Sequence, residues 1–215
     1  ENMLNERGIL IVVSGFSGAG KGTVMKRLME KYHDAYALSV SMTTRQAREG
    51  EVDGQHYFFV SREQFEKNIE KDGFIEHAQY CGNYYGTPKA YVEKMLGEGK
   101  NVILEIEIQG ALLVKEKFPE TLLLFVTPPS AVELKKRLVG RNTETMEQIE
   151  ARLKRAIEEA PIMDKYDYIV VNDEVENCVD KIHELVDAAR HSTVRNREFI
   201  ERMKKELVEL SGGEE

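Results

Sequence analysis

The chain has 215 residues, of which 41% are hydrophobic and 32% are charged, a balance that is ordinary for a soluble globular protein. This composition excludes disordered and fibrous proteins, and the length suffices for one sizeable domain with inserted subdomains. The 30 Lys and Arg residues are outnumbered by 38 Asp and Glu, giving a formal net charge of −8. Because of that negative charge, we expect no nucleic-acid partner, and any phosphate must be bound locally.

The sequence indicates neither a disulfide framework nor a zinc site. Cys81 and Cys178 are its only cysteines, and they stand far apart in neither a CxxC nor another metal-ligand spacing. The apolar run at residues 9–13 is too short for a signal sequence or a membrane span. We therefore expect a protein of the reducing cytoplasm with no membrane partner.

Strands and helices are expected to alternate along most of the chain. The β-branched run at residues 9–13 predicts a strand covered on both faces, and apolar residues then recur at helical spacing to about Tyr32. Further buried strands are expected at residues 101–106, 122–126 and 168–171. This order predicts an α/β fold whose parallel sheet is flanked by helices.

Two segments interrupt this alternation. Residues 39–87 are rich in Thr, Arg, Gly and aromatic residues and predict a small mixed β insert, whereas residues 130–159 are charged and helical. A last helix at residues 194–210 places Ile200, Met203, Leu207 and Leu210 on one face. The expected organisation is a core of residues 1–38, 88–129 and 160–192, an insert of 39–87, a lid of 130–159, and a C-terminal helix and tail of 193–215.

Several helix starts carry capping signals. The capping-box spacing, in which a hydroxyl residue is followed three positions later by Gln or Glu, occurs at Ser61, Ser130 and Thr145. Thr87 followed by Pro88 predicts an N-cap with proline at the first helical position.

The segment between the first strand and the first helix has the spacing G-x-x-x-x-G-K, from Gly15 to Lys21. Its glycines let successive backbone N–H groups turn inward around phosphates, and its lysine supplies a mobile cation. A plain glycine-rich turn is the alternative, but Lys21 and both flanking elements favour a phosphate loop. The residues expected to bind the nucleotide phosphates are Gly15, Ser17, Gly18, Ala19, Gly20, Lys21, Gly22 and Thr23.

One position departs from the general motif, which has Ser or Thr directly after the lysine. Gly22 stands there instead, and the hydroxyl comes one residue later at Thr23. We expect Mg²⁺ to enter with ATP and to be held mainly by phosphate oxygens and water, with Thr23 as the single candidate protein ligand.

A second anion site is expected in the insert. Arg45 and Arg48 stand three residues apart, with Tyr57 nine residues further on. Two planar guanidinium groups can clamp one phosphomonoester bidentately. The alternative is that both arginines form surface salt bridges with Glu49 and Glu51.

At this point the sequence resembles the guanylate kinase family. Three runs of residues occur in the family's order: Ser39 to Tyr57, Phe74-Ile-Glu-His-Ala78 and Gly82-Asn-Tyr-Tyr-Gly-Thr87. The resemblance covers about residues 8–185. It implies that Arg45, Arg48, Tyr57 and Tyr85 hold the phosphate of GMP and that Ser41, Glu76 and Thr87 read its base. A carboxylate that accepts and hydroxyls that donate are indeed complementary to guanine.

The resemblance also assigns the transfer machinery. Glu107, at the end of a buried strand, stands where the family usually has Asp, and it is expected to contact GMP or, alternatively, Mg²⁺-bound water. Asn172 matches a position that touches adenine, and a helix cap is the local alternative for it. Phosphoryl transfer needs positioning and cations more than a base, and the catalytic candidates are Lys21, Arg137, Arg141 and Arg152. Asn142 replaces the glycine usual after the lid arginine. The implied reaction is direct in-line transfer from ATP to GMP, with lid closure.

Three other classes of protein compete with this interpretation. A signalling GTPase needs an N-K-x-D motif, which is absent. Scaffold proteins with a guanylate-kinase-like domain typically lack an intact phosphate loop, whereas Lys21 is present here. A kinase for another monophosphate differs in base selection at Ser41, Glu76 and Thr87. Neither a monomer nor a homo-oligomer is favoured.

Overall fold

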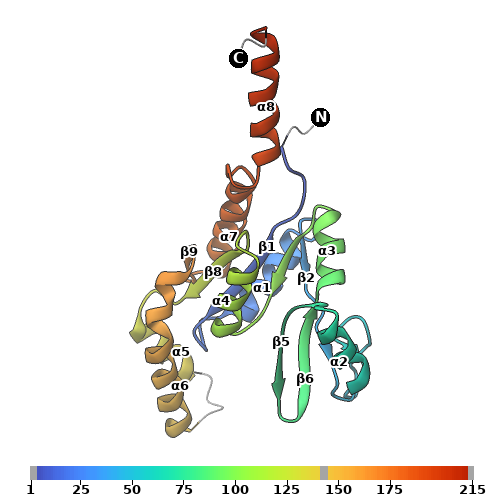
Figure 1. Cartoon of the computed structure of the whole chain (residues 1–215). Coiled ribbons are helices and arrows are strands. Elements are labelled where there is room, and N and C mark those ends of the chain that lie inside the picture. The colour runs from blue at the N-terminus through green and yellow to red at the C-terminus, as the bar shows by residue number, and fades with distance from the viewer. Residues whose placement is uncertain (1–3, 141–144, 213–215) are drawn as a thin grey trace.

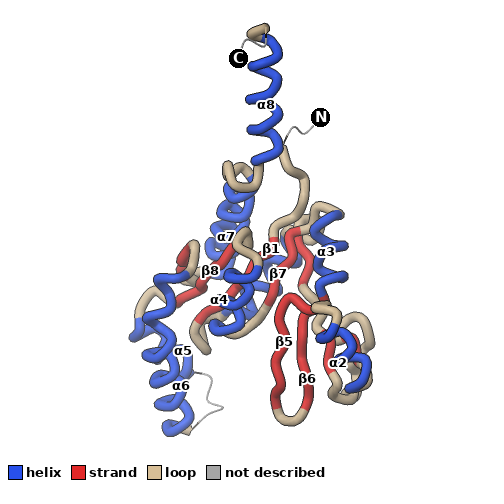
Figure 2. The backbone as a smooth tube through the Cα atoms, in the orientation of Figure 1, coloured by secondary structure: helices blue, strands red, loops and turns tan. Residues whose placement is uncertain are grey.

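The structure, a computed structural model, describes residues 4–140 and 145–212 of the chain. Two β-sheets organise these residues (Figures 1 and 2): a parallel five-stranded sheet in the order β2-β7-β1-β8-β9 and a smaller four-stranded sheet in the order β4-β3-β6-β5. The α/β fold with a helix-flanked parallel sheet is therefore confirmed.

The large sheet has β1 at its centre. Its strands are β1 (Leu10–Gly15), β2 (Tyr36–Leu38), β7 (Asn101–Leu104), β8 (Leu122–Thr127) and β9 (Tyr168–Val171). The four expected strands are confirmed with shifts of up to two residues at their ends, but the short β2 was not predicted. β9 was expected to be buried, yet it is an edge strand in which Val170 alone is buried.

Helices cover both faces of this sheet, which explains the unbroken apolar run in β1. On one face, Ile11 and Val13 pack with α1 (Lys21–Lys31) and α7 (Val175–Arg190). On the other face, Leu10 and Val12 pack with α3 (Lys89–Gly97) and α4 (Ile108–Lys117). Because side chains alternate along a strand, a strand between two helical layers must be apolar at every position.

The small sheet confirms the mixed β insert. It consists of β3 (Met42–Thr43), β4 (Phe58–Phe59), β5 (Phe74–Tyr80) and β6 (Asn83–Pro88), in which β3 pairs parallel with β4 and antiparallel with β6. Helix α2 (Arg62–Glu70) covers it by inserting Phe65 between Phe74 and Tyr84, with ring centroids 4.4 and 5.0 Å away.

The charged segment at residues 130–159 forms two helices that lie side by side in Figure 1, α5 (Ala131–Gly140) and α6 (Met146–Glu159). They share a small core of Leu134, Leu138 and Ile149, and the 3-10 helix η1 (Ala160–Lys165) leads back to β9. Helix α8 (Arg197–Leu210) ends the described chain.

The capping signals were partly right. Complete capping boxes are present at Ser61 before α2 and at Thr145 before α6. At Ser130 the hydroxyl accepts from the backbone of Glu133, but the Glu133 carboxylate accepts from Arg137.

The N-cap predicted at Thr87 is wrong. Strand β6 runs on through Pro88, which pairs with Phe74, so that Pro88 becomes the residue before α3. The Thr87 hydroxyl donates to Glu76 instead. A sheet pairing therefore overrides a sequence signal that is local by nature.

The Ser61 capping box predicts the effect of one substitution. Replacing Ser61 with Ala leaves the Gln64 N–H without its acceptor, and we expect a loss of about 0.5–2 kcal/mol in the free energy of unfolding. Urea denaturation measures this loss, and Ser61→Asp, which keeps an acceptor, serves as the control. Equal destabilisation by both variants would contradict the capping role.

Candidate functional site

The phosphate-loop motif lies at the carboxyl end of β1. Gly18 and Gly20 have φ of 92° and 83°, which glycine adopts without strain, and Gly20 directly precedes α1. The loop therefore points backbone N–H groups and a helix N-terminus at the same space. Ser17 and Lys21 line a cavity of about 290 Å³ there, together with Glu105 and Glu107 after β7.

Two of the loop glycines are required by close contacts. A Cβ on Gly15 would stand 2.4 Å from the Val126 carbonyl oxygen, and one on Gly20 would stand 2.6 Å from Nδ2 of Asn172. Gly22 differs, because a Cβ there meets no atom within 4 Å. Thr23 is exposed in the first turn of α1.

Asn172 and Arg137 form hydrogen bonds that support the backbone of the phosphate loop. The buried amide of Asn172 donates to the carbonyl of Ala19 at 2.8 Å. Arg137 donates from Nη2 to the carbonyl of Asn172 at 2.9 Å and from Nη1 to that of Ala19 at 3.4 Å. The helix-cap alternative for Asn172 is wrong, since α7 begins at Val175 after Glu174.

In the insert, Arg45 is brought together with two tyrosines. Its guanidinium lies 5.4 Å from the ring centroid of Tyr57, and the rings of Tyr57 and Tyr85 are 6.1 Å apart. Arg45 also donates bidentately to Glu51 at 2.8 and 2.9 Å and to the Gln46 carbonyl. These three bonds use fewer than the five N–H donors of a guanidinium, so Arg45 can bind a further oxygen.

Glu51 is the acidic partner of this cluster. The side-chain hydrogen bond from Arg45 and the backbone N–H of Arg48 lower the pKa of Glu51 from 4.5 to about 2. The salt-bridge alternative weighed for the arginines is thus present for Arg45, while the Arg48 side chain is exposed. Glu51 fixes the direction of the Arg45 side chain.

Glu76 and Thr87 form a second polar pair, between β5 and β6. The hydroxyl of Thr87, which is fully buried, donates to Oε1 of Glu76 at 2.8 Å. Glu76 forms no ion pair with a cation in residues 4–140 and 145–212, and its burial raises its pKa above 4.5, although the Thr87 bond partly offsets this. Ser41 is half-buried just before β3, and its carbonyl accepts a hydrogen bond from the backbone N–H of Phe58.

One contact was missed by the sequence analysis. Arg155 of α6 donates to Glu107 at 3.1 Å and to Glu159 at 2.7 Å, and all three line the loop cavity with Lys21. Nothing local in the sequence signals this contact, because Glu107 lies 48 residues from Arg155 in the chain. Arg152 is partly buried on the same helix, whereas Arg141 and Asn142 lie outside the described residues.

The part of the chain that the structure describes contains no group of three or more His, Cys, Asp or Glu side chains arranged to hold a metal ion. Within the same residues, every helix is too short or too polar to cross a bilayer.

The raised pKa of Glu76 predicts a trade between stability and function. Because the folded-state pKa lies above the unfolded value, ionised Glu76 destabilises the fold as pH rises through the folded pKa. We expect Glu76→Gln to melt at a higher temperature than the native protein at pH 7.

The same substitution should lose its advantage on acidification, because both states of the native protein are protonated at Glu76 below about pH 4.5. Calorimetric melting at pH 7, 5.5 and 4 measures the difference. Glu70→Gln, on the exposed end of α2, is the control. An unchanged or lower melting temperature for Glu76→Gln at pH 7 would show that the carboxylate is not strained by burial.

The chain is similar in sequence and fold to guanylate kinases. The model of the guanylate kinase family matches residues 7–189. Guanylate kinases from two strains of Clostridium perfringens are 52% and 51% identical over 205 residues, which is 95% of this chain and 91% of each relative. The crystal structure of guanylate kinase from Anaplasma phagocytophilum aligns with a TM-score of 0.68 at 34% identity, covering 94% of this chain and 97% of that one.

Proposed function

The chain belongs to the guanylate kinase family and catalyses the ATP-dependent phosphorylation of GMP to GDP, and we propose that the transfer is direct, in line and accompanied by closure of α5 and α6. The observation that carries this proposal is the pairing of an intact phosphate loop with a half-buried carboxylate, that of Glu76, which forms no salt bridge with Lys or Arg among the described residues. The phosphate loop supplies the site for the phosphoryl donor, and the carboxylate of Glu76 recognises the base of the acceptor.

ATP binds at the loop between β1 and α1. Backbone N–H groups of Gly18 to Lys21 surround its phosphates, and Lys21 neutralises charge that develops during transfer. Loop shape depends on the bond from Asn172 to Ala19, so Asn172 serves by positioning the loop as well as by bordering the nucleotide. Arg137 has the same two roles, because its guanidinium donates to the carbonyls of both Ala19 and Asn172.

GMP binds in the insert. Arg45, Arg48, Tyr57 and Tyr85 hold its phosphate, with Glu51 orienting Arg45. Glu76 accepts hydrogen bonds from the N–H groups of guanine, and the hydroxyls of Ser41 and Thr87 complete the set. Adenine, which has no 2-amino group, leaves the half-buried carboxylate of Glu76 without a donor on the base, and this loss disfavours AMP.

Magnesium fits the donor set near the loop. The carboxylates of Glu105 and Glu107 line the cavity, and Mg²⁺ prefers oxygen ligands while keeping several waters. These two residues, or Thr23 in the first turn of α1, would hold the ion or its waters. When bound with ATP it neutralises phosphate charge.

Closure of α5 and α6 over the donor site brings arginines to the migrating phosphoryl group. Arg137 and Arg152 lie on these helices, and Arg141 follows α5 in the sequence. The bond from Arg155 to Glu107 already joins α6 to the start of α4 across the cavity. We therefore divide the chain into core, GMP-binding insert, lid and C-terminal helix.

A substrate panel tests the function. Coupled assays with Mg·ATP and each of GMP, AMP and UMP should give a kcat/KM that strongly favours GMP, because a hydrogen-bonding site rejects analogues that leave its polar groups unpaired. Comparable use of AMP or UMP would rule out the base assignment. No turnover with any acceptor would favour a scaffold role over an enzyme.

Arg45→Ala tests the phosphate clamp. We expect GMP binding to weaken by about 1.5–3 kcal/mol, the scale of a charged hydrogen bond. Isothermal titration calorimetry measures the affinity, and Arg62→Ala, which removes an exposed arginine of α2, is the control. Unchanged affinity in Arg45→Ala would remove this residue from the site.

A further inference from the structure

Arg155 of α6 lines the cavity of about 290 Å³ beside the phosphate loop. Ser17 and Lys21 line the same cavity from the loop, so a phosphate group bound there lies against α6 as well as against the loop. In the part of the chain that the structure describes, neither Arg137 nor Arg152 lines this cavity. The position of Arg155 therefore indicates a role in phosphate chemistry that the sequence did not assign to it.

Two carboxylates hold Arg155, and they hold it unequally. Glu159, one turn further along α6, accepts from Nε at 2.7 Å, and its side chain is only 17% exposed. Glu107, the residue before α4, accepts from Nη2 at 3.1 Å, and its side chain is 80% exposed. Because water screens exposed ion pairs, they contribute little to stability. The bond to Glu159 thus fixes the direction of the guanidinium, whereas the bond to Glu107 can be exchanged for another anion.

The Arg155 guanidinium has further donors. Within the described residues, the two bonds engage two of its five N–H groups, which leaves both hydrogens of Nη1 and one of Nη2 to donate to another acceptor. A guanidinium presents such donors side by side, an arrangement that matches two oxygens of one phosphate group. Arg155 can therefore bind a phosphate group while Nε stays bonded to Glu159.

The charges around the cavity favour a second cation at the transferred group. Glu105, Glu107 and Glu159 place three carboxylates on its wall, against the cations of Lys21 and Arg155. Phosphoryl transfer spreads negative charge over the oxygens of the migrating group, and catalysis depends on cations positioned to stabilise that charge. A guanidinium that leaves Glu107 for those oxygens adds positive charge where Lys21 alone would face three carboxylates.

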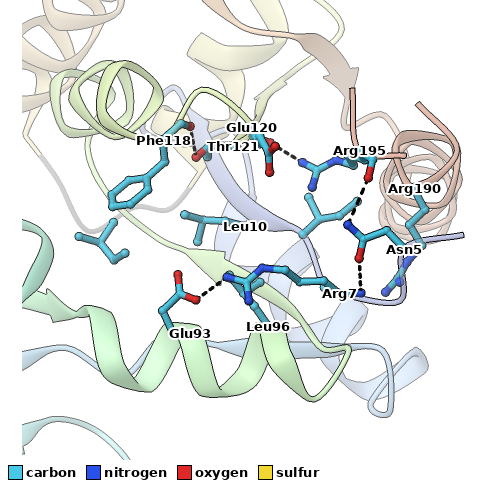
Figure 3. A pocket seen from close by; sticks show the side chains of 13 residues that line it. Asn5, Arg7, Leu10, Glu93, Leu96, Phe118, Glu120, Thr121, Arg190 and Arg195 are labelled. Atoms are coloured by element: carbon cyan, nitrogen blue, oxygen red, sulfur yellow. Dashed lines mark hydrogen bonds and ion pairs between the residues drawn. The ribbon is translucent and has the colours of Figure 1, made fainter. Parts of the chain in front are cut away.

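Arginines also line a cavity of about 90 Å³ elsewhere in the fold, and these have a different role (Figure 3). Leu10, the first residue of β1, lines that cavity, which therefore lies at the opposite end of β1 from the phosphate loop. Figure 3 shows Arg7 bound to the carboxylate of Glu93 and Arg195 bound to the carbonyl of Glu120. Those arginines connect segments of the chain, whereas Arg155 shares a cavity with the phosphate loop.

We propose that Arg155 is a further catalytic residue of the phosphoryl transfer, and that its guanidinium exchanges the carboxylate of Glu107 for oxygens of the migrating phosphoryl group. The inference rests on the proposed function, since it takes the loop cavity as the place of transfer.

The role of Arg155 in the transfer is electrostatic. A bond forms from a phosphate oxygen of GMP to the γ-phosphorus of ATP, while the bond from that phosphorus to the bridging oxygen breaks and ADP leaves. Arg155 donates hydrogen bonds to the oxygens of the group in transit. It transfers no proton, because a guanidinium stays charged in proteins. The exposed carboxylate of Glu107 is then hydrated by water.

Single-turnover kinetics with rapid quenching test this contact, because they measure the transfer step apart from product release. With Mg·ATP and GMP saturating, we expect Arg155→Ala to slow transfer by about a hundredfold, the effect of removing one donor from a charge-stabilising site. The affinity for GMP, measured by isothermal titration calorimetry, should change by less than about threefold, because the contact is made in the transition state. Lys154→Ala, which removes the exposed neighbouring cation of α6, is the control and should transfer at the native rate.

The Glu107→Gln background separates a phosphate contact from a merely structural ion pair. If Arg155 served only to hold Glu107, Arg155→Ala would have no further effect once that carboxylate is gone. We expect Arg155→Ala to slow transfer in this background by about as much as in the native chain. Arg155→Lys keeps the charge without the planar fork and should transfer at an intermediate rate. Because Arg155 is exposed, thermal melting of each variant should remain close to that of the native protein.

The outcomes distinguish this inference from the function on which it rests. Native transfer rates in Arg155→Ala, an equal loss in Lys154→Ala, or a loss that disappears in the Glu107→Gln background would each overturn the role of Arg155 in a native protein that phosphorylates GMP. A native protein that phosphorylates no monophosphate would instead overturn the proposed function.

Discussion

The central place of β1 in a parallel sheet is the constraint on which the rest of the structure depends. Parallel strands end at the same edge, so the loop after β1 meets the residues after β7 and β9 there. Glu105 and Glu107 reach the loop cavity from β7, and Asn172 reaches Ala19 from β9. The donor site is thus built from three strand ends, and loss of any one contact would change its shape.

The acceptor side follows a different principle. Because an acidic protein attracts no polyanion at long range, the proposed GMP site relies on a few guanidinium groups to hold the phosphate. Glu51 provides that direction for Arg45 by a bidentate bond. Glu76 is the opposite case, a partly buried carboxylate with a hydroxyl as its partner, which costs stability in the free protein; in the proposed complex, the donor groups of the base offset this cost.

Local sequence predicted those features that depend on local physics. The strand, glycine loop and helix around Lys21 were predictable because periodicity and backbone geometry depend on residues that are close in the sequence. The Thr87 cap failed because pairing of Pro88 with Phe74 extends β6, and Arg155 was overlooked because its partner Glu107 is distant in the chain. The sequence could not predict that β9 is an edge strand, because an apolar run does not indicate how many strands pair with it.

The central claim is that Glu76 reads the amino group of guanine, and inosine monophosphate, which lacks that group, tests it most directly. The native enzyme should prefer GMP to IMP in kcat/KM by about tenfold or more, as a hydrogen bond to a charged group implies, and Glu76→Gln should lose most of this preference. Equal use of GMP and IMP by the native enzyme, or an undiminished preference in Glu76→Gln, would contradict the account.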